Sequence, residues 1–353
     1  MDESVFKSVK RACYAGLDSV RLRTEVAARV GRAIRFDAHA FGTADPATGL
    51  LNHLVADGMP SPLALAYADY LYPLETAAYS IDAARQGKSL LRAGEESPDL
   101  ADAERATGFA FGIEVLLASN GCLWGKWCLL RETEGNAARE RALLRRLVPH
   151  LSRALQHASL IDGAFDGDPF AEPRSGVIVV DHVGRALMRS PAVRPMLDDL
   201  ADVGVRFDDG IPLSILTLAT RLRCTARAAS DGVPESAMLR ARGRSGRWYV
   251  VQASLAETSP DGRESVVVVL RPMLPRELAP MLTTLYGLSS REREVVAAVV
   301  RGDTTREIAE HLAISPHTVK EHLDRACAKT GARGRRALIA RLFRDAYRPT
   351  LLS

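Results

Sequence analysis

Helix start and stop signals follow one another closely near the C-terminal end of this chain. Ser289 precedes a charged run that carries a glutamate at the capping-box position, Glu292, and Gly302 follows the last apolar residue of that run. Ser315-Pro316 then combines a hydroxyl N-cap with a proline at the first helical position, where its missing N–H costs nothing. The residues from Ser289 onward are therefore predicted to form a compact set of short helices.

Apolar residues at helical spacing within this segment predict which sides of the helices are buried. The expected helices run from Ser290 to Gly302, Thr305 to Leu312, His317 to about Lys329 and about Gly334 to Ala346. Ala309 is small enough for a second helix to cross closely. On the third helix Val319 and Leu323 face inward, and the opposite face is polar. A polar face on a well-capped helix suits contact with a polar, hydrated partner such as DNA.

Three stretches of this segment resemble the signature of LuxR-type transcription regulators. They read LSSREREVV from Leu288, GDTTREIA from Gly302 and SPHTVKEHL from Ser315. The resemblance implies a helix-turn-helix whose third helix reads double-stranded DNA and whose fourth helix contacts a second copy in a homodimer. The sequence departs from the family at Glu321 and Asp324, where basic or small residues are common, so the preferred bases cannot be copied.

DNA contacts are expected from the start of the second helix and from the outward face of the third. The predicted DNA-binding residues are Thr305, His317, Thr318, Lys320, Glu321, Asp324, Arg325 and Lys329. The resemblance implies dimer contacts at Leu338 and Leu342. From Tyr286 onward the chain has 13 Lys and Arg against 8 Asp and Glu, while the whole chain carries +4. This positive end suits a polyanion, although a solvated helical face would also produce it.

The upstream residues predict two further α+β units, because 353 residues exceed one ordinary domain. Apolar runs flank Asn120-Gly121, the pair that favours a type I′ hairpin turn. This hairpin, with Trp124 to Arg131 before a long closing helix, resembles a GAF-like domain. A strand is predicted from Val177 to Asp181, and the motif GVIVVD from Gly176 together with three closing strands resembles a PAS domain. We associate this domain order with actinobacterial regulators.

The resulting expectation is a multidomain chain. It consists of an α+β GAF-like sensor domain at 1–165, an α+β PAS-like domain at 166–272, a linker at 273–285 and an all-α four-helix LuxR-type helix-turn-helix domain at 286–353.

Both upstream folds enclose a cavity that can hold a small-molecule ligand. The predicted ligand-binding residues are Phe41, Tyr70, Trp124 and Trp127, and core packing is the competing interpretation of each. Two hypotheses stay open for this half of the chain. It is either a ligand sensor or a ligand-free platform for protein interaction and dimerisation.

Other functions have weaker support. Gln86 to Ser89 resembles the end of a P-loop, but Asp82 stands where that motif needs glycine. Asp181 ends a valine-rich strand as a phosphoacceptor would, yet closing hairpins follow instead of an α/β receiver. Five scattered cysteines and spread histidines predict no metal site, and we expect no catalytic residues, enzyme activity or cofactor. The acidic start at Asp2 and the lack of long apolar runs predict a cytoplasmic protein with no membrane partner.

Overall fold

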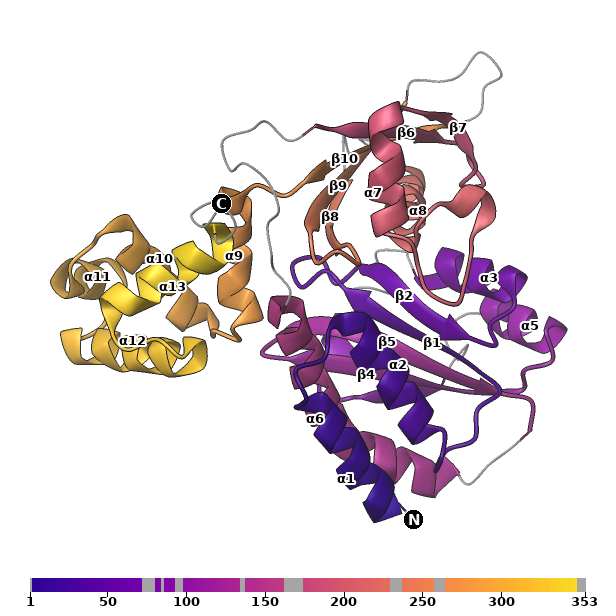
Figure 1. The fold of residues 1–353 in the computed structure, drawn as a ribbon, viewed down its shortest axis with the longest axis horizontal. Coiled ribbons are helices and arrows are strands. Elements are labelled where there is room, and N and C mark those ends of the chain that lie inside the picture. The colour runs from indigo at the N-terminus through magenta and orange to yellow at the C-terminus, as the bar shows by residue number, and fades with distance from the viewer. Residues whose placement is uncertain are drawn as a thin grey trace. The chain divides into compact units, whose positions relative to one another are not determined.

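The computed structural model describes residues 2–71, 80–83, 86–92, 98–133, 137–161, 174–228, 237–256 and 264–347. The described residues divide into two compact units, one up to residue 272 and one from residue 273 onward. Figure 1 shows the helices and strands of both units.

The first unit is an α+β region built on two five-stranded antiparallel sheets. The first sheet has the order β2-β1-β5-β4-β3. Its strands are β1 (Ala38–Ala44), β2 (Leu51–Asp57), β3 (Leu90–Arg92), β4 (Phe111–Ser119) and β5 (Cys122–Arg131). The predicted hairpin is confirmed, because Asn120 and Gly121 join β4 to β5 with φ angles of 52° and 75°.

Helices accompany this first sheet, and three of them pack against one another. They are α1 (Asp2–Cys13), α2 (Ser19–Val30), α3 (Ser61–Leu71), α5 (Pro98–Ala106) and α6 (Ala137–Ile161). The mutually packed helices are α1, α2 and α6, and α6 lies against β4 and β5 (Figure 1). The long closing helix was predicted, with Pro149 inside it, whereas α1 was not predicted.

The second sheet has the order β7-β6-β10-β9-β8. Its strands are β6 (Gly176–Val180), β7 (Ala186–Arg189), β8 (Ala237–Arg242), β9 (Trp248–Leu255) and β10 (Val266–Pro272). The associated helical segments are η1 (Pro191–Val193), α7 (Arg194–Asp199), η2 (Asp208–Gly210) and α8 (Leu213–Ala228). The three predicted closing strands are confirmed as β8, β9 and β10.

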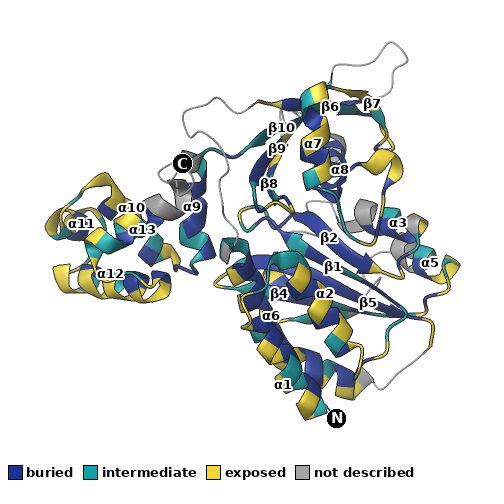
Figure 2. Ribbon diagram, in the orientation of Figure 1, coloured by how far each residue is buried: buried dark blue, intermediate teal, exposed yellow. Residues whose placement is uncertain are grey.

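Main-chain bonds join the edge strand β2 of the first sheet to the segment between α7 and η2. Ala56 N donates to Val203 O over 2.8 Å, and Val203 N donates to Leu54 O over 2.9 Å. Asp202 accepts from the N–H of Leu54 and of Leu213, at 2.6 and 2.7 Å. One apolar core therefore runs through both sheets, and buried residues line it on each side of this joint (Figure 2).

The second unit is helical. It consists of α9 (Pro275–Leu285), α10 (Ser290–Arg301), α11 (Thr305–His311), α12 (Pro316–Thr330) and α13 (Arg335–Tyr347). The predicted linker at 273–285 thus contains a helix, whose start is closed by a hydrogen bond of 2.9 Å from Leu274 N to Glu277 Oε2. This helix packs against α13. Within the described ranges, no helix is both long and apolar enough to span a membrane.

Candidate nucleic-acid interface

Side-chain caps start each of the helices α10, α11 and α12. Ser289 and Thr304 each accept a bond from the N–H three residues later, and Glu292 and Glu307 complete the two capping boxes. Ser315 Oγ accepts from Thr318 N over 3.0 Å, with Pro316 at the first helical position. The predicted start signals are confirmed. The short α11 and the turn before α12 are thereby fixed by neighbouring residues alone.

A small apolar core holds these helices together. Val295, Val299, Ile308 and Val319 are almost completely buried, and Ala309 sits among them. Ala309 is the position predicted to allow a close helix crossing, and burial there leaves little room for a larger side chain. The predicted inward face of α12 is confirmed by the burial of Val319.

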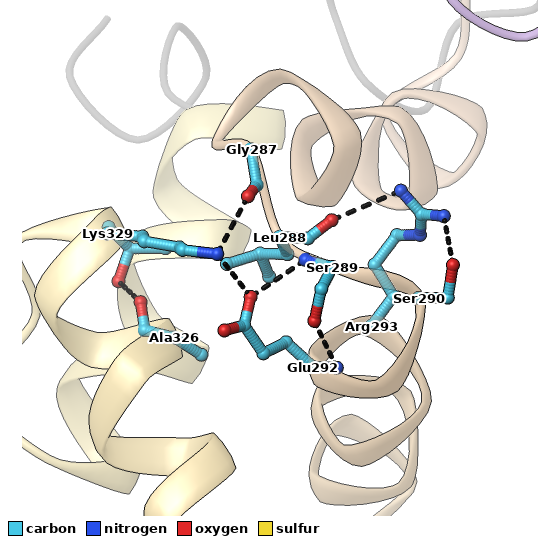
Figure 3. A network of polar contacts seen from close by, with 9 residues as sticks. Gly287, Leu288, Ser289, Ser290, Glu292, Arg293, Ala326 and Lys329 are labelled. Atoms are coloured by element: carbon cyan, nitrogen blue, oxygen red, sulfur yellow. Dashed lines mark hydrogen bonds and ion pairs between the residues drawn. The ribbon is translucent and has the colours of Figure 1, made fainter. Parts of the chain in front are cut away.

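A second link ties the end of α12 to the start of α10 (Figure 3). Lys329 Nζ donates to Glu292 Oε2 over 2.6 Å and to Gly287 O over 3.0 Å. The same carboxylate oxygen accepts from Ser289 N over 2.7 Å. Glu292 is only 3% exposed, so its charge needs these donors. Burial alone would raise the pKa of Glu292, but the bonds from Lys329 and Ser289 outweigh it and hold that pKa below its ordinary value.

The outward face of α12 is polar and exposed. His317, Lys320, Glu321, Asp324 and Arg325 are all exposed on it. Glu321 lies between two basic neighbours, because its carboxylate is 3.6 Å from His317 Nε2 and 3.6 Å from Arg325. The negative charge of Glu321 is therefore partly offset within the helix, which reduces the repulsion it would exert on a phosphate.

The other predicted DNA-binding residues occupy different environments. Thr318 is partly exposed at the start of α12, and its hydroxyl is 2.9 Å from Ser315 Oγ. Thr305 is partly exposed at the start of α11. The ammonium of Lys329 is bound within the unit, as described above, and its side chain is 37% exposed.

Leu338 and Leu342 lie in the core of the single chain rather than on its surface. Their exposed fractions are 0% and 4%, and the helix that carries them, α13, packs against α9. In this arrangement they offer almost no surface to a second copy. Helix α9 was not predicted, because the prolines in this segment indicated a linker.

The predicted ligand-binding aromatic residues are core residues in the first unit. Phe41 stacks on Trp127 with ring centroids 4.8 Å apart, and both are buried. Trp124 donates from Nε1 to Ser119 Oγ over 2.8 Å. Tyr70 belongs to α3, but its side chain lies outside the described part of the structure. Core packing accounts for the contacts of the first three.

Sequence reasoning missed a polar cluster in the first sheet, on the face opposite to Phe41 and Trp127. A cavity of about 30 Å³ is lined by Tyr67, Glu114, Lys126 and Cys128 together with apolar residues. Lys126 Nζ lies 3.2 Å from Glu114 Oε1, and the two side chains are only 6% and 12% exposed. The signal was present, since Glu114 and Lys126 each interrupt an apolar stretch inside a hairpin strand, on one face of the sheet.

Tyr67 and Cys128, which line this cavity, make further contacts beside it. The hydroxyl of Tyr67 donates to the carboxylate of Glu104 and lies 3.1 Å from Cys128 Sγ. Burial, above all, raises the pKa of the Cys128 thiol well above its ordinary value. The thiol is therefore protonated and a poor nucleophile. Among the residues that the structure describes, no group of three or more His, Cys, Asp or Glu could hold a metal ion.

Comparison with known proteins locates a family match in the second unit. Residues 287–342 match the family described as bacterial regulatory proteins, luxR family. The spore germination protein GerE of Bacillus subtilis (strain 168) is 44% identical over 57 residues, which make up 16% of this chain and 77% of that protein. Because the match covers 16% of this chain, it carries no information about most of the first unit.

Solved structures also resemble parts of this chain. SdiA of Escherichia coli is 13% identical with a TM-score of 0.32, covering 99% of this chain and 98% of that one. VqmA of Vibrio cholerae in complex with a ligand and DNA is 16% identical with a TM-score of 0.25, covering 49% of this chain and 83% of that one. TM-scores this low support no conclusion about the first unit.

Proposed function

This chain belongs to the luxR family of bacterial regulatory proteins and is a DNA-binding transcription regulator, and we propose that it reads specific DNA sequences with α12 as a homodimer. The observation that carries the assignment of α12 is the contrast between its two faces. Its inward face is fixed by Val319 and by the Lys329–Glu292 pair, while its outward face presents exposed polar side chains. A rigid helix with a free polar face fits the major groove.

The exposed residues of α12 divide by the chemistry they offer to DNA. Lys320 and Arg325 supply positive charge for phosphates or for guanine edges, and Thr305 and Thr318 supply hydroxyls near helix starts. Asp324 offers an acceptor that suits the exocyclic amine of cytosine or adenine. We assign Lys329 to the scaffold, because its ammonium already has two partners within the unit.

The Lys320→Ala variant tests the recognition-helix proposal. A duplex selected from a randomised pool by the full chain serves as the probe, and fluorescence anisotropy at ~150 mM salt measures affinity. Loss of one direct contact is expected to weaken binding about fivefold or more, corresponding to ~1 kcal/mol or more. Arg145→Ala, which removes an exposed charge from α6, is the matched control and should not change affinity. Unchanged affinity in Lys320→Ala would remove α12 from the interface.

We propose that the first unit senses a small ligand and that its two sheets correspond to a GAF-like domain at 1–165 and a PAS-like domain at 166–272. The polar cluster around Lys126 supports this proposal, because a buried ion pair beside a cavity is a costly arrangement for packing alone. Ligand binding would change the relative population of two dimer geometries and so the fit of two recognition helices to their half-sites.

The alternative is a ligand-free platform for dimerisation and protein interaction. The extensive burial of Phe41, Trp124 and Trp127 favours it, since these aromatic rings are used for packing. Native mass spectrometry of the full chain purified from its source separates the two proposals. A small molecule that copurifies at one copy per chain supports the sensor. A dimer without a bound molecule, whose DNA affinity does not change when small molecules from the cell extract are added, supports the platform.

A further inference from the structure

The charges that face each other along the seam between α1 and α6 change from opposite to alike. At the start of α1, Asp2 pairs with Arg139 over 2.5 Å and Glu3 pairs with Arg146 over 2.9 Å. The later part of α1 carries Lys10 and Arg11 instead of acids. After Glu140, α6 has no acidic residue as far as its end at Ile161. Positive charge is therefore left uncompensated at one end of this seam.

A groove of about 390 Å³ opens at this positively charged end. Its walls come from the end of α1, the turn that leads into α2 and the second half of α6. The floor is apolar, because Cys13, Leu22 and Ala154 are buried there. Burial raises the pKa of the Cys13 thiol to about 12, so this side chain stays neutral. The volume falls within the ~300–1,000 Å³ typical of small-molecule sites.

Two basic side chains border the groove. Arg153 and His157 are exposed and stand four residues apart, on one face of α6. None of the described residues that line the groove is acidic. The acid at the end of the turn, Asp18, is used elsewhere, since it caps α2 through Arg21 N at 2.8 Å and pairs with the Arg21 side chain at 3.4 Å.

Positive charges also lie near His150, a histidine beside the groove. His150 accepts or donates a bond of 2.9 Å with the hydroxyl of Tyr14, which borders the groove. Burial, and then the positive charges of Lys10 and Arg153, lower the pKa of His150 below its ordinary value. Lys10 and Arg153 therefore place positive charge beside the groove, and positive charge favours an anion there.

We propose that this groove binds a small amphiphilic organic anion, with its acidic head between Arg153 and His157 and its apolar body on Cys13, Leu22 and Ala154. A single anion satisfies both halves of the site. The head relieves the repulsion among the uncompensated cations, and the body covers an apolar floor that an inorganic ion would leave exposed to water. Ligand binding here does not depend on the DNA-binding proposal.

Isothermal titration calorimetry of the full chain tests this site, with decanoate below its micellar concentration as the probe. One decanoate per chain is expected, and 1-decanol, which has the same body without the charge, should bind at least about tenfold more weakly. Arg153→Gln should weaken decanoate binding about tenfold, and Arg153→Lys should retain most of it. Arg145→Gln, an exposed arginine of the same helix outside the groove, is the matched control.

Three outcomes would overturn the proposal. Decanoate and 1-decanol could bind equally, which would make the site a purely apolar surface. Arg153→Gln could leave decanoate affinity unchanged, which would place the head elsewhere. Finally, the chain could bind vesicles that contain phosphatidylglycerol and ignore monomeric decanoate, which would assign the anionic surface to a membrane rather than to a small molecule. DNA affinity measured on Arg153→Gln without ligand should equal that of the wild type, so a failed site is distinguishable from a failed DNA interface.

Discussion

Replacing Lys329 with methionine removes the link between the end of α12 and the start of α10. The variant loses one charge-assisted hydrogen bond to Glu292, worth about 1.5–3 kcal/mol, and one bond to Gly287 O, worth about 1 kcal/mol. Glu292 would keep the bond from Ser289 N but remain a buried carboxylate without a cation. Because the Lys329 side chain is 37% exposed, water replaces part of what is lost. The expected net loss is about 2 kcal/mol.

Hydrogen exchange measured by mass spectrometry on the full chain detects this loss locally. A loss of about 2 kcal/mol corresponds to a roughly 30-fold increase in the opening equilibrium, and therefore in the exchange rate of slow amides. The increase is expected in peptides from α10 and α12 and not in peptides from α6. Lys320→Met is the matched control, because it shortens an exposed lysine of the same helix that lies on the opposite face.

The pH dependence of this effect follows from the lowered pKa of Glu292. A carboxyl whose folded-state pKa is depressed contributes stability above its unfolded pKa and loses it as pH falls through the folded value. The difference between wild type and Lys329→Met should therefore be full near neutral pH and shrink in acid. An increase of less than about threefold at neutral pH, or an equal increase in Lys320→Met, would refute the role given to this ion pair.

Two further predictions concern the segment between α7 and η2 that bonds to β2. In Gly204→Ala, the new Cβ would lie 1.8 Å from Ala56 O at a φ of +76°, so the free energy of unfolding, measured by urea titration, should fall by about 2–4 kcal/mol. In Gly210→Ala, where φ is +64° and the space is open, it should fall by only about 1 kcal/mol. Equal losses in the two variants would contradict the close approach. Burial raises the pKa of Asp202 to about 7 against the hydrogen bonds it accepts, so its contribution to stability should fall as pH rises from about 4 to about 7 and then stay level. Urea titrations of wild type and Asp202→Asn across that range check this, and parallel pH profiles would rule it out.

Local signals determined much of the second unit and part of the first. Ser289, Thr304 and Ser315 act on N–H groups three residues away, so their roles can be read without knowing the rest of the fold. The turn at Asn120-Gly121 is equally local, because only its own φ angles matter. The outward face of α12 followed from helical periodicity, which needs no partner.

Proline signals were less informative. The residues 273–285 contain prolines and were predicted to form a linker, yet α9 forms there because Pro275 occupies the first turn of a helix, where proline is tolerated. Leu338 and Leu342, for which the family resemblance had implied a dimer contact, are buried within the chain on α13, the helix that packs against α9. The surface that a helix offers to a partner depends on which of its residues the rest of the chain already buries.

The sequence by itself determined where the capped helices α10, α11 and α12 begin, where the Asn120-Gly121 hairpin turns, and which face of α12 is polar. Those properties depend on residues within a few positions of one another. Only the tertiary structure decided which side chains meet across long stretches of chain. Lys329 reaches Glu292, Val203 pairs with β2, and Arg153 borders a groove with Cys13, and each depends on how whole elements pack. Such contacts carry no local pattern, since packing geometry rather than neighbouring residues selects the partner.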